Sequence, residues 1–315
     1  DEVQENFVGF NPQRSELVPG GFGEITLKPN SIWEFVLGGR IDYHNLFGWY
    51  PQPRAHLKAS PRENLAFRLS GGRAFRTPNY FADRLGVLTT SRLITIDPNL
   101  KPEESWSAGG GIQWSPRLFG REAQLSADIF RTWIDRQMVA NRETPGQLSI
   151  EMHEQAAWSQ AIQLNAAMFP VERLELRLSY KWQEVYSTFG NQTLRMPLVP
   201  EQRGLASLGY EIKSWGLFLD FTAQLVGPSR LPELNDPNVN RPLRSDWYAL
   251  FLGQIRKELG IFQVYIGGEN LGNFTQDNPI VQPNDPYNSN FDAGFIWAPV
   301  FGRMIYVGVH IEPGK

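Results

Sequence analysis

Apolar and polar residues alternate along many short segments of this chain. In residues 174–183, a leucine, tyrosine or tryptophan stands at every even position, and a charged or polar residue stands at every odd position. Residues 33–43 follow a similar alternation, with Trp33, Phe35 and Leu37 on one side. Because successive side chains of a strand point to opposite faces, such segments are predicted to be strands with one apolar and one polar face.

The same alternation predicts thirteen strands along the chain. They cover residues 20–27, 33–43, 54–60, 64–73, 104–115, 121–134, 155–169, 174–183, 203–212, 215–226, 247–256, 261–271 and 303–311. No helical period competes with them, and Gly and Pro fall between the strands rather than at a domain boundary. We therefore expect one all-β unit over residues 1–315.

The connections between these strands alternate in length. Short ones fall at 28–31, 61–63, 116–120, 170–172, 213–214 and 257–260, and long ones at 44–53, 74–103, 135–154, 187–202, 227–246 and 272–302. Short periplasmic turns and long extracellular loops are typical of an outer-membrane barrel. If the last strand runs toward the periplasm, every long connection lies outside the cell. The alternative is a soluble β-sandwich or β-helix.

The apolar runs are too short for a transmembrane helix, which needs about 20 apolar residues. A barrel strand needs only about 9–11 residues, of which every second one faces lipid. The chain would then place Leu174, Leu176 and Leu178 toward lipid and Arg177 and Lys181 toward the lumen. The same rule places Leu217, Leu219 and Phe221 toward lipid and Asp220 and Gln224 toward the lumen.

Composition excludes several function classes. The formal net charge is −3 and no block of basic residues occurs, so we expect no nucleic-acid partner. The chain has no cysteine, which excludes disulfides, thiolate metal sites and thiol catalysis. Ten tryptophans among 13% aromatic residues suit an interface with protein or lipid.

Catalytic motifs are missing from the sequence. The four histidines are scattered, there is no HExxH, and no G-x-S-x-G nucleophile elbow occurs. The run from Gly109 to Gly111 lacks the Lys and Ser/Thr of a phosphate loop, and is better explained by close packing in a barrel wall. We expect neither catalysis, nor a cofactor, nor a bound metal. An outer-membrane barrel enzyme and a passive porin-like channel stay as alternatives.

Four stretches resemble the barrel of TonB-dependent outer-membrane receptors, particularly the kind common in Bacteroidetes. They are RLSGGRAFRTPNYFADRL from Arg68, IDPNLKPEESWSAGGGIQW from Ile96, VYIGGENLGNF from Val264 and PVFGRMIYVGVHI from Pro299. Their order and spacing extend over most of the chain and resemble the C-terminal part of that barrel. The chain departs from the family at its end, Ile311-Glu-Pro-Gly-Lys, where an aromatic residue is usual.

The resemblance implies a transmembrane antiparallel barrel of about 22 strands that surrounds a plug domain. Thirteen strands are too few and an odd number, so we expect a partial barrel that a missing N-terminal part or a partner chain completes. The plug domain and the N-terminal strands are not recognisable in this chain. The implied function is active uptake of a scarce solute, such as a metal chelate, cobalamin or haem. The implied partners are outer-membrane lipid, the extracellular solute, and TonB through the plug.

Two long connections supply the candidate solute-binding residues. In the connection at 74–103, Arg76 offers bidentate hydrogen bonds to an anion. Asn79 offers an amide, and Tyr80 offers a stacking face. From 272–302 the candidates are Asn278, Asp285, Tyr287 and Asn290. The competing interpretations are that Arg76 fixes the exit of the connection from its strand, and that 272–302 is a hydrated, turn-rich loop.

Overall fold

The computed structural model describes residues 2–4, 13–79, 82–99, 101–144, 146–154, 157–233 and 241–312. Over these residues the chain consists of strands and loops, with two short 3-10 turns, η1 (Ala82–Val87) and η2 (Lys213–Trp215). In the described part of the chain, no helix has the length and apolar character needed to cross a membrane.

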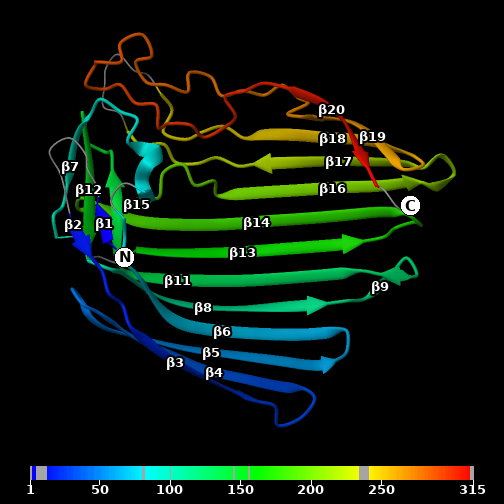
Figure 1. Ribbon diagram of the computed structural model, residues 1–315, viewed down its shortest axis with the longest axis horizontal. Coiled ribbons are helices and arrows are strands. Elements are labelled where there is room, and N and C mark those ends of the chain that lie inside the picture. The colour runs from blue at the N-terminus through cyan, green and yellow to red at the C-terminus, as the bar shows by residue number, and fades with distance from the viewer. Residues whose placement is uncertain are drawn as a thin grey trace.

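One antiparallel sheet contains a counterpart of each of the thirteen predicted strands, so the predicted all-β class is confirmed. In chain order they are β3 (Gly20–Leu27), β4 (Trp33–His44), β5 (Gly48–Arg62), β6 (Leu65–Arg76), β8 (Glu103–Trp114), β11 (Gln124–Asn141), β13 (Ala157–Met168), β14 (Leu174–Phe189), β16 (Gln202–Ile212), β17 (Leu217–Val226), β18 (Tyr248–Leu259), β19 (Phe262–Glu269) and β20 (Met304–Ile311). Each of them pairs with the next, which makes a continuous meander from β3 to β20 (Figure 1).

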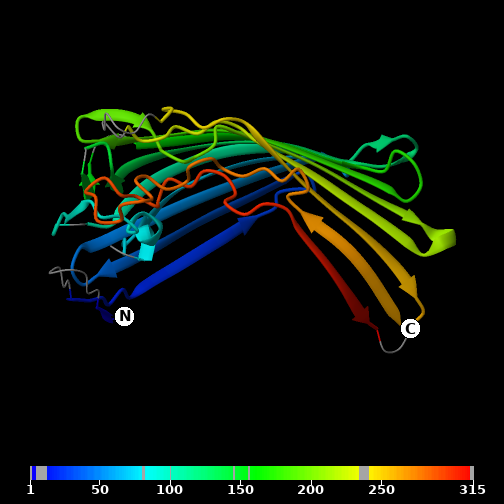
Figure 2. The same ribbon diagram turned by 90° about the horizontal axis from the view of Figure 1, so that it is seen from above.

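The sheet curls into an arch and does not close on itself (Figure 2). Among the described strands, β3 pairs only with β4, and β20 pairs only with β19. Both outer strands therefore carry an edge whose backbone groups have no partner strand. This agrees with the expectation that these residues alone do not close a barrel.

The two ends of the arch differ. Tight turns such as the one between β5 and β6 lie at one end, and the long connections gather at the other (Figure 1). The chain leaves β20 at the end with the tight turns. This is the arrangement that the alternation of short and long connections predicts.

One predicted long connection is wrong. Residues 44–53 were expected to form a loop, but β4 and β5 extend toward each other and leave only residues 45–47 between them. Pro51 and Pro53 sit inside β5, opposite Ile41 and Gly39. Proline lacks the N–H that a ladder needs, so a strand with two prolines reads as a loop in the sequence.

The register divides the sheet into the two predicted faces. Leu176 lies opposite Leu208, which lies opposite Phe221, whereas Arg177 lies opposite Ser207. Apolar side chains on the first face stay open to the surroundings, as shown by Val307, which is 75% exposed. A sheet with one exposed apolar face and one polar face fits a barrel wall that has lipid on its outside.

An aromatic row marks the apolar face at the end with the long connections. Trp106, Trp133, Trp158 and Tyr186 are direct cross-strand neighbours on β8, β11, β13 and β14. Trp114 lies at the opposite end of β8. Aromatic residues gather at the two interfaces of a membrane, so these positions bracket the apolar band of the wall.

Short strands also occur outside the meander. β7 (Leu93–Ile96), β12 (Gln147–His153) and β15 (Gln192–Arg195) lie in the long connections and were not predicted from the sequence. The others are β1 (Glu2–Gln4) and β2 (Gln13–Ser15), which precede β3, and β9 (Arg117–Leu118) and β10 (Arg121–Glu122), which lie in the short connection between β8 and β11. β12 pairs with β11 and, in parallel, with β7. Met138 and Ile150 are fully buried where β11 and β12 meet, so the connections have a small core of their own.

Candidate solute-binding surfaces

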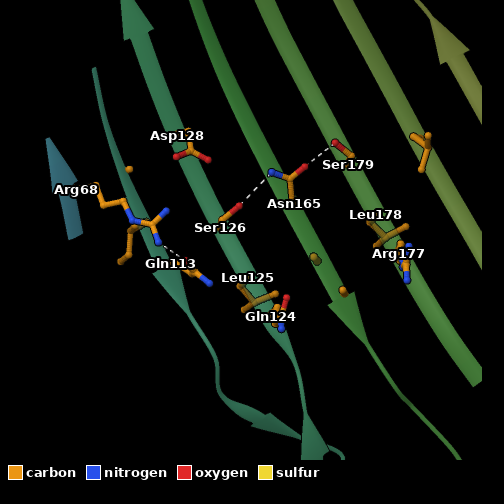
Figure 3. Close-up of a pocket in the computed structure, with 15 residues that line it drawn as sticks. Arg68, Gln113, Gln124, Leu125, Ser126, Asp128, Asn165, Arg177, Leu178 and Ser179 are labelled. Carbon is orange, nitrogen blue, oxygen red and sulfur yellow. Dashed lines mark hydrogen bonds between the residues drawn. The ribbon is translucent and has the colours of Figure 1, made fainter. Parts of the chain in front are cut away.

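A chain of hydrogen bonds crosses the polar face of the sheet. Ser126, Asn165 and Ser179 are cross-strand neighbours on β11, β13 and β14. The Asn165 amide donates to Ser126 Oγ at 3.0 Å and accepts from Ser179 Oγ at 2.8 Å (Figure 3). These bonds fix three side chains that line a hollow on this face.

A hollow of about 450 Å³ lies over these residues; Arg68 and Gln113 line it from β6 and β8, and Asp128 lines it beside Ser126 on β11 (Figure 3). Arg68 donates to Gln113 Oε1 at 2.8 Å. A Cβ atom on Gly111 would lie 2.1 Å from Asp128 Oδ1, so this glycine makes room for the carboxylate. Within the described residues no cation lies at ion-pair distance from Asp128, whose charge therefore faces the hollow unneutralised.

Two cations oppose each other on the same face. Lys181 of β14 lies directly across from Arg203 of β16. Neither makes an ion pair with any described residue. Like charges directly opposite each other are destabilising in a sheet, so this pair favours an anion between or above the two side chains.

An aromatic cluster adjoins this pair. Val226 separates Arg203 from Tyr248 along one cross-strand row. The Tyr248 ring stacks on Phe274 at 5.2 Å, and its hydroxyl donates to the Trp297 carbonyl at 3.3 Å. The β19–β20 connection, which carries Phe274 and Trp297, lies under the arch (Figure 2). The polar face is therefore the concave one.

The candidates at the exit of β6 are engaged with their own connection. Arg76 donates to Glu103 Oε2 at 2.9 Å and lies 3.2 Å from Asp83. The backbone N–H of Asn79 donates to the same Asp83 carboxylate at 3.1 Å. Tyr80 lies outside the described residues. These contacts favour the interpretation that Arg76 fixes the exit of the connection from its strand.

The candidates of the β19–β20 connection are spread over its turns. The Asn278 carbonyl accepts a hydrogen bond from Arg241. Asp285 accepts from the backbone N–H of Tyr287 at 3.3 Å, and the Tyr287 side chain is 96% exposed. The backbone N–H of Asn290 donates to the Asn288 side chain at 2.9 Å. Among the described residues, no hydrogen bond joins Asn278, Asp285 or Tyr287 to Arg76 or Asn79, although their two connections do touch.

The contact surface between the β6–β8 and β19–β20 connections contains a buried cluster of charged side chains, which was not predicted from the sequence. Asp292 is fully buried, 3.2 Å from Arg92 and 3.7 Å from Arg142. Both guanidinium groups lie over the Phe295 ring, at 5.8 and 4.6 Å from its centre. Asp292 stood among many similar Asp and Asn residues, and nothing in its neighbours marks it as the buried one.

The cluster extends to a fourth connection. Glu143, next to Arg142, accepts from Arg230 at 2.6 Å. We call Arg92, Arg142, Glu143, Arg230 and Asp292 the loop clasp. Its members come from the β6–β8, β11–β12, β17–β18 and β19–β20 connections, so it ties four connections into one body.

Opposing effects act on the carboxyl of Asp292. Burial raises its pKa, whereas Arg142, the backbone N–H of Gly294 and Arg92 act to lower it. A buried charge is costly unless it is paired and hydrogen-bonded. The clasp therefore depends on all its members being present together.

The described residues contain no group of three or more His, Asp or Glu side chains placed to hold a metal ion. The chemistry of the concave face and of the connections is that of hydrogen bonding, ion pairing and aromatic stacking.

Comparisons with solved structures identify the architecture. The ferric enterobactin receptor of Pseudomonas aeruginosa, in a variant bound to enterobactin, matches with a TM-score of 0.69, 14% identity and coverage of 93% of this chain and 45% of that one. The siderophore receptor PirA of Acinetobacter baumannii matches at 0.68 and 14%, with coverage of 93% and 45%. The FrpB iron transporter of Neisseria meningitidis matches at 0.65 and 15%, with coverage of 95% and 44%.

The chain thus spans a little under half the length of these receptors. None of the curated proteins matches it in sequence. The family model described as TonB dependent receptor-like, beta-barrel matches residues 5–271, which is most of the chain. Such receptors are proteins of the bacterial outer membrane, and the apolar face therefore meets lipid. This chain belongs to the TonB-dependent receptor β-barrel family.

Proposed function

We propose that the protein is an outer-membrane receptor that takes up a scarce, large solute with energy delivered by TonB. The match of residues 5–271 to the receptor barrel family carries this proposal. The open edges of β3 and β20 support a complete receptor in which further strands close the barrel around a plug. We propose that this chain supplies the C-terminal part of that barrel, in a receptor of the Bacteroidetes type, as the four motif stretches suggest.

The concave face favours an anionic solute. Lys181 and Arg203 form an uncompensated cationic pair beside the ring of Tyr248. A negatively charged metal chelate with flat ligand groups would satisfy both the charge and the stacking surface. The matched structures are a ferric enterobactin receptor, a siderophore receptor and an iron transporter, which supports testing an iron chelate before cobalamin or haem.

The connections supply the first contacts with the solute in this proposal. Asn278, Asp285 and Tyr287 offer exposed hydrogen-bonding groups and one exposed ring, and Asn290 is half-buried in the same connection. Arg76, Asn79 and Tyr80 remain candidates, with the engaged contacts of Arg76 favouring a structural role for it. Solute binding to cells carrying Arg76→Ala or Tyr80→Ala at equal surface abundance separates binding from structure. Unchanged affinity in both rejects a binding role for the pair.

Uptake of a radioactive ferric chelate into iron-starved cells tests the function. We expect uptake in cells that express the complete receptor, and loss of uptake when either the receptor or TonB is removed. Uptake that persists without TonB would point instead to a passive channel. Chemical change of the chelate at the cell surface, in the absence of uptake, would point to a barrel enzyme.

A further inference from the structure

A row of polar side chains crosses the lipid-facing side of the sheet just inside the aromatic row. Arg131 of β11 donates to Gln160 of β13 at 2.8 Å. Gln160 in turn donates to Glu184 of β14 at 3.3 Å. Arg131 stands two residues before Trp133 and lies directly opposite Gln160, so it shares the face of Ile129 and Trp133. The row therefore lies on the membrane side of the tryptophans.

Arg131 has aromatic neighbours but no counter-ion. Its guanidinium lies 4.4 Å from the ring centre of Trp158 and 5.6 Å from that of Trp133. Across the described part of the chain, no carboxylate is within ion-pair distance of it. Glu184, the carboxylate of the row, is already paired with Arg195 at 2.5 Å. A cation on a lipid-facing surface is unfavourable unless an anion compensates it, and the described residues place no carboxylate within ion-pair distance of Arg131.

An apolar groove lies beneath the row on the same face. Gly204, Ala206 and Ala223 form its floor, and Tyr180 and Phe251 are among the larger residues beside them. The hollow measures about 500 Å³. Tyr180 stands four residues before Glu184 on β14, so the groove begins about 13 Å along the strand from the polar row. Small residues in the middle of a lipid-facing wall leave room for one extended hydrocarbon chain.

We propose that Arg131 and this groove together bind one phosphate-bearing lipid of the outer leaflet. The phosphate would accept hydrogen bonds from the Arg131 guanidinium, which matches phosphate geometry and carries the missing charge complement. One acyl chain of the same molecule would lie over Gly204, Ala206 and Ala223. The site is on the outside of the barrel wall and is separate from the concave face that meets the solute.

Binding of bisphosphorylated lipid A to the complete receptor in detergent micelles tests this site. We expect Arg131→Gln to weaken lipid A binding about tenfold, the scale of one lost hydrogen-bonded ion contact, and to leave unchanged the binding of diacylglycerol, which has acyl chains but no phosphate. Ala206→Phe fills the groove and is expected to weaken lipid A binding as well. The melting temperature of each variant shows whether the barrel is intact.

Two matched variants serve as controls. Arg117→Gln removes an exposed arginine at the opposite end of the wall, and Ala55→Phe enlarges a lipid-facing residue outside the groove. The proposal is overturned if Arg131→Gln binds lipid A as tightly as Arg117→Gln does, or if Ala206→Phe and Ala55→Phe behave alike. It is also overturned if inorganic phosphate displaces lipid A from the wild type, because the site would then recognise the free anion rather than the lipid.

Discussion

Neighbouring positions on one strand carry different kinds of side chain, because they point to opposite faces of the sheet. Leu176 and its neighbours Leu208 and Phe221 form a continuous apolar surface toward lipid. Arg177, one residue further along, points to the concave face and lies 2.6 Å from Glu175. Side-chain direction, rather than hydrophobicity alone, therefore decides the effect of a substitution.

We predict that Leu176→Arg impairs barrel assembly more strongly than Arg177→Leu. A charged residue facing lipid near mid-membrane costs about 2–4 kcal/mol, whereas loss of an exposed ion pair costs at most about 1 kcal/mol. The folded fraction in isolated outer membranes, read from heat-modifiable gel mobility, measures the difference. Equal folded fractions for the two variants would contradict the assignment of faces.

Within one element, the three consecutive glycines of β8 show why a strand tolerates no side chain at certain positions. A Cβ atom on Gly109 would lie 2.1 Å from a carbon of the Phe130 ring and 2.8 Å from the Ile129 carbonyl oxygen. β8 is thus held against β11 by the packing of Phe130 over its backbone. Gly39 of β4 differs, because the space at its Cβ position is open.

We predict that Gly109→Ala destabilises the complete receptor by about 1–3 kcal/mol, because the Phe130 ring and the backbone of β11 must shift. Gly39→Ala, also within a strand, serves as its control and should change the stability by well under 1 kcal/mol. Urea unfolding of the receptor in lipid vesicles measures both. A destabilisation by Gly39→Ala as large as that by Gly109→Ala would rule out packing as the cause.

The sequence predicts the elements of the wall far better than those of the connections. In strands such as β14 and β17, apolar and polar residues alternate clearly in the sequence, because one face meets lipid and the other meets water. The ends of the strands were less well predicted: β14 continues to Phe189 and β11 to Asn141, beyond the region where alternation is enforced. The parallel pairing of β12 with β7 joins segments about 50 residues apart and leaves no local pattern to read.

The described part of the molecule is a curved sheet, and four of its long connections are held together by contacts at one end. The loop clasp joins Arg92 and Asp292, which are two hundred positions apart in the sequence, and no periodicity could predict that contact. Further bonds run beside it, such as Thr90 Oγ1 donating to the Phe291 carbonyl at 2.8 Å. The connections are therefore fixed relative to one another at this end of the wall.

We predict that Asp292→Asn loosens all four connections at once. The substitution keeps the shape of the side chain but leaves Arg92 and Arg142 buried without their counter-charge, a loss of about 3 kcal/mol. Hydrogen exchange of the complete receptor should rise in residues 88–96, 141–150, 227–233 and 278–295 while the wall strands stay protected. Asp285→Asn, an exposed residue of the same connection, is the control; exchange confined to the β19–β20 connection would show that the clasp does not couple the others.

The orientation of the whole molecule can be tested because the chain contains no cysteine, so that one introduced thiol is the only thiol it contributes. Tyr287 is 96% exposed in the β19–β20 connection, and Glu63 is exposed in the tight turn between β5 and β6. If the long connections face outward, Tyr287→Cys should react with a membrane-impermeant maleimide on intact cells. Glu63→Cys should react only after the outer membrane is opened, since its turn faces the periplasm. The reverse labelling pattern would show that the tight turns lie outside, and the concave face could then not receive a solute through the clasped connections.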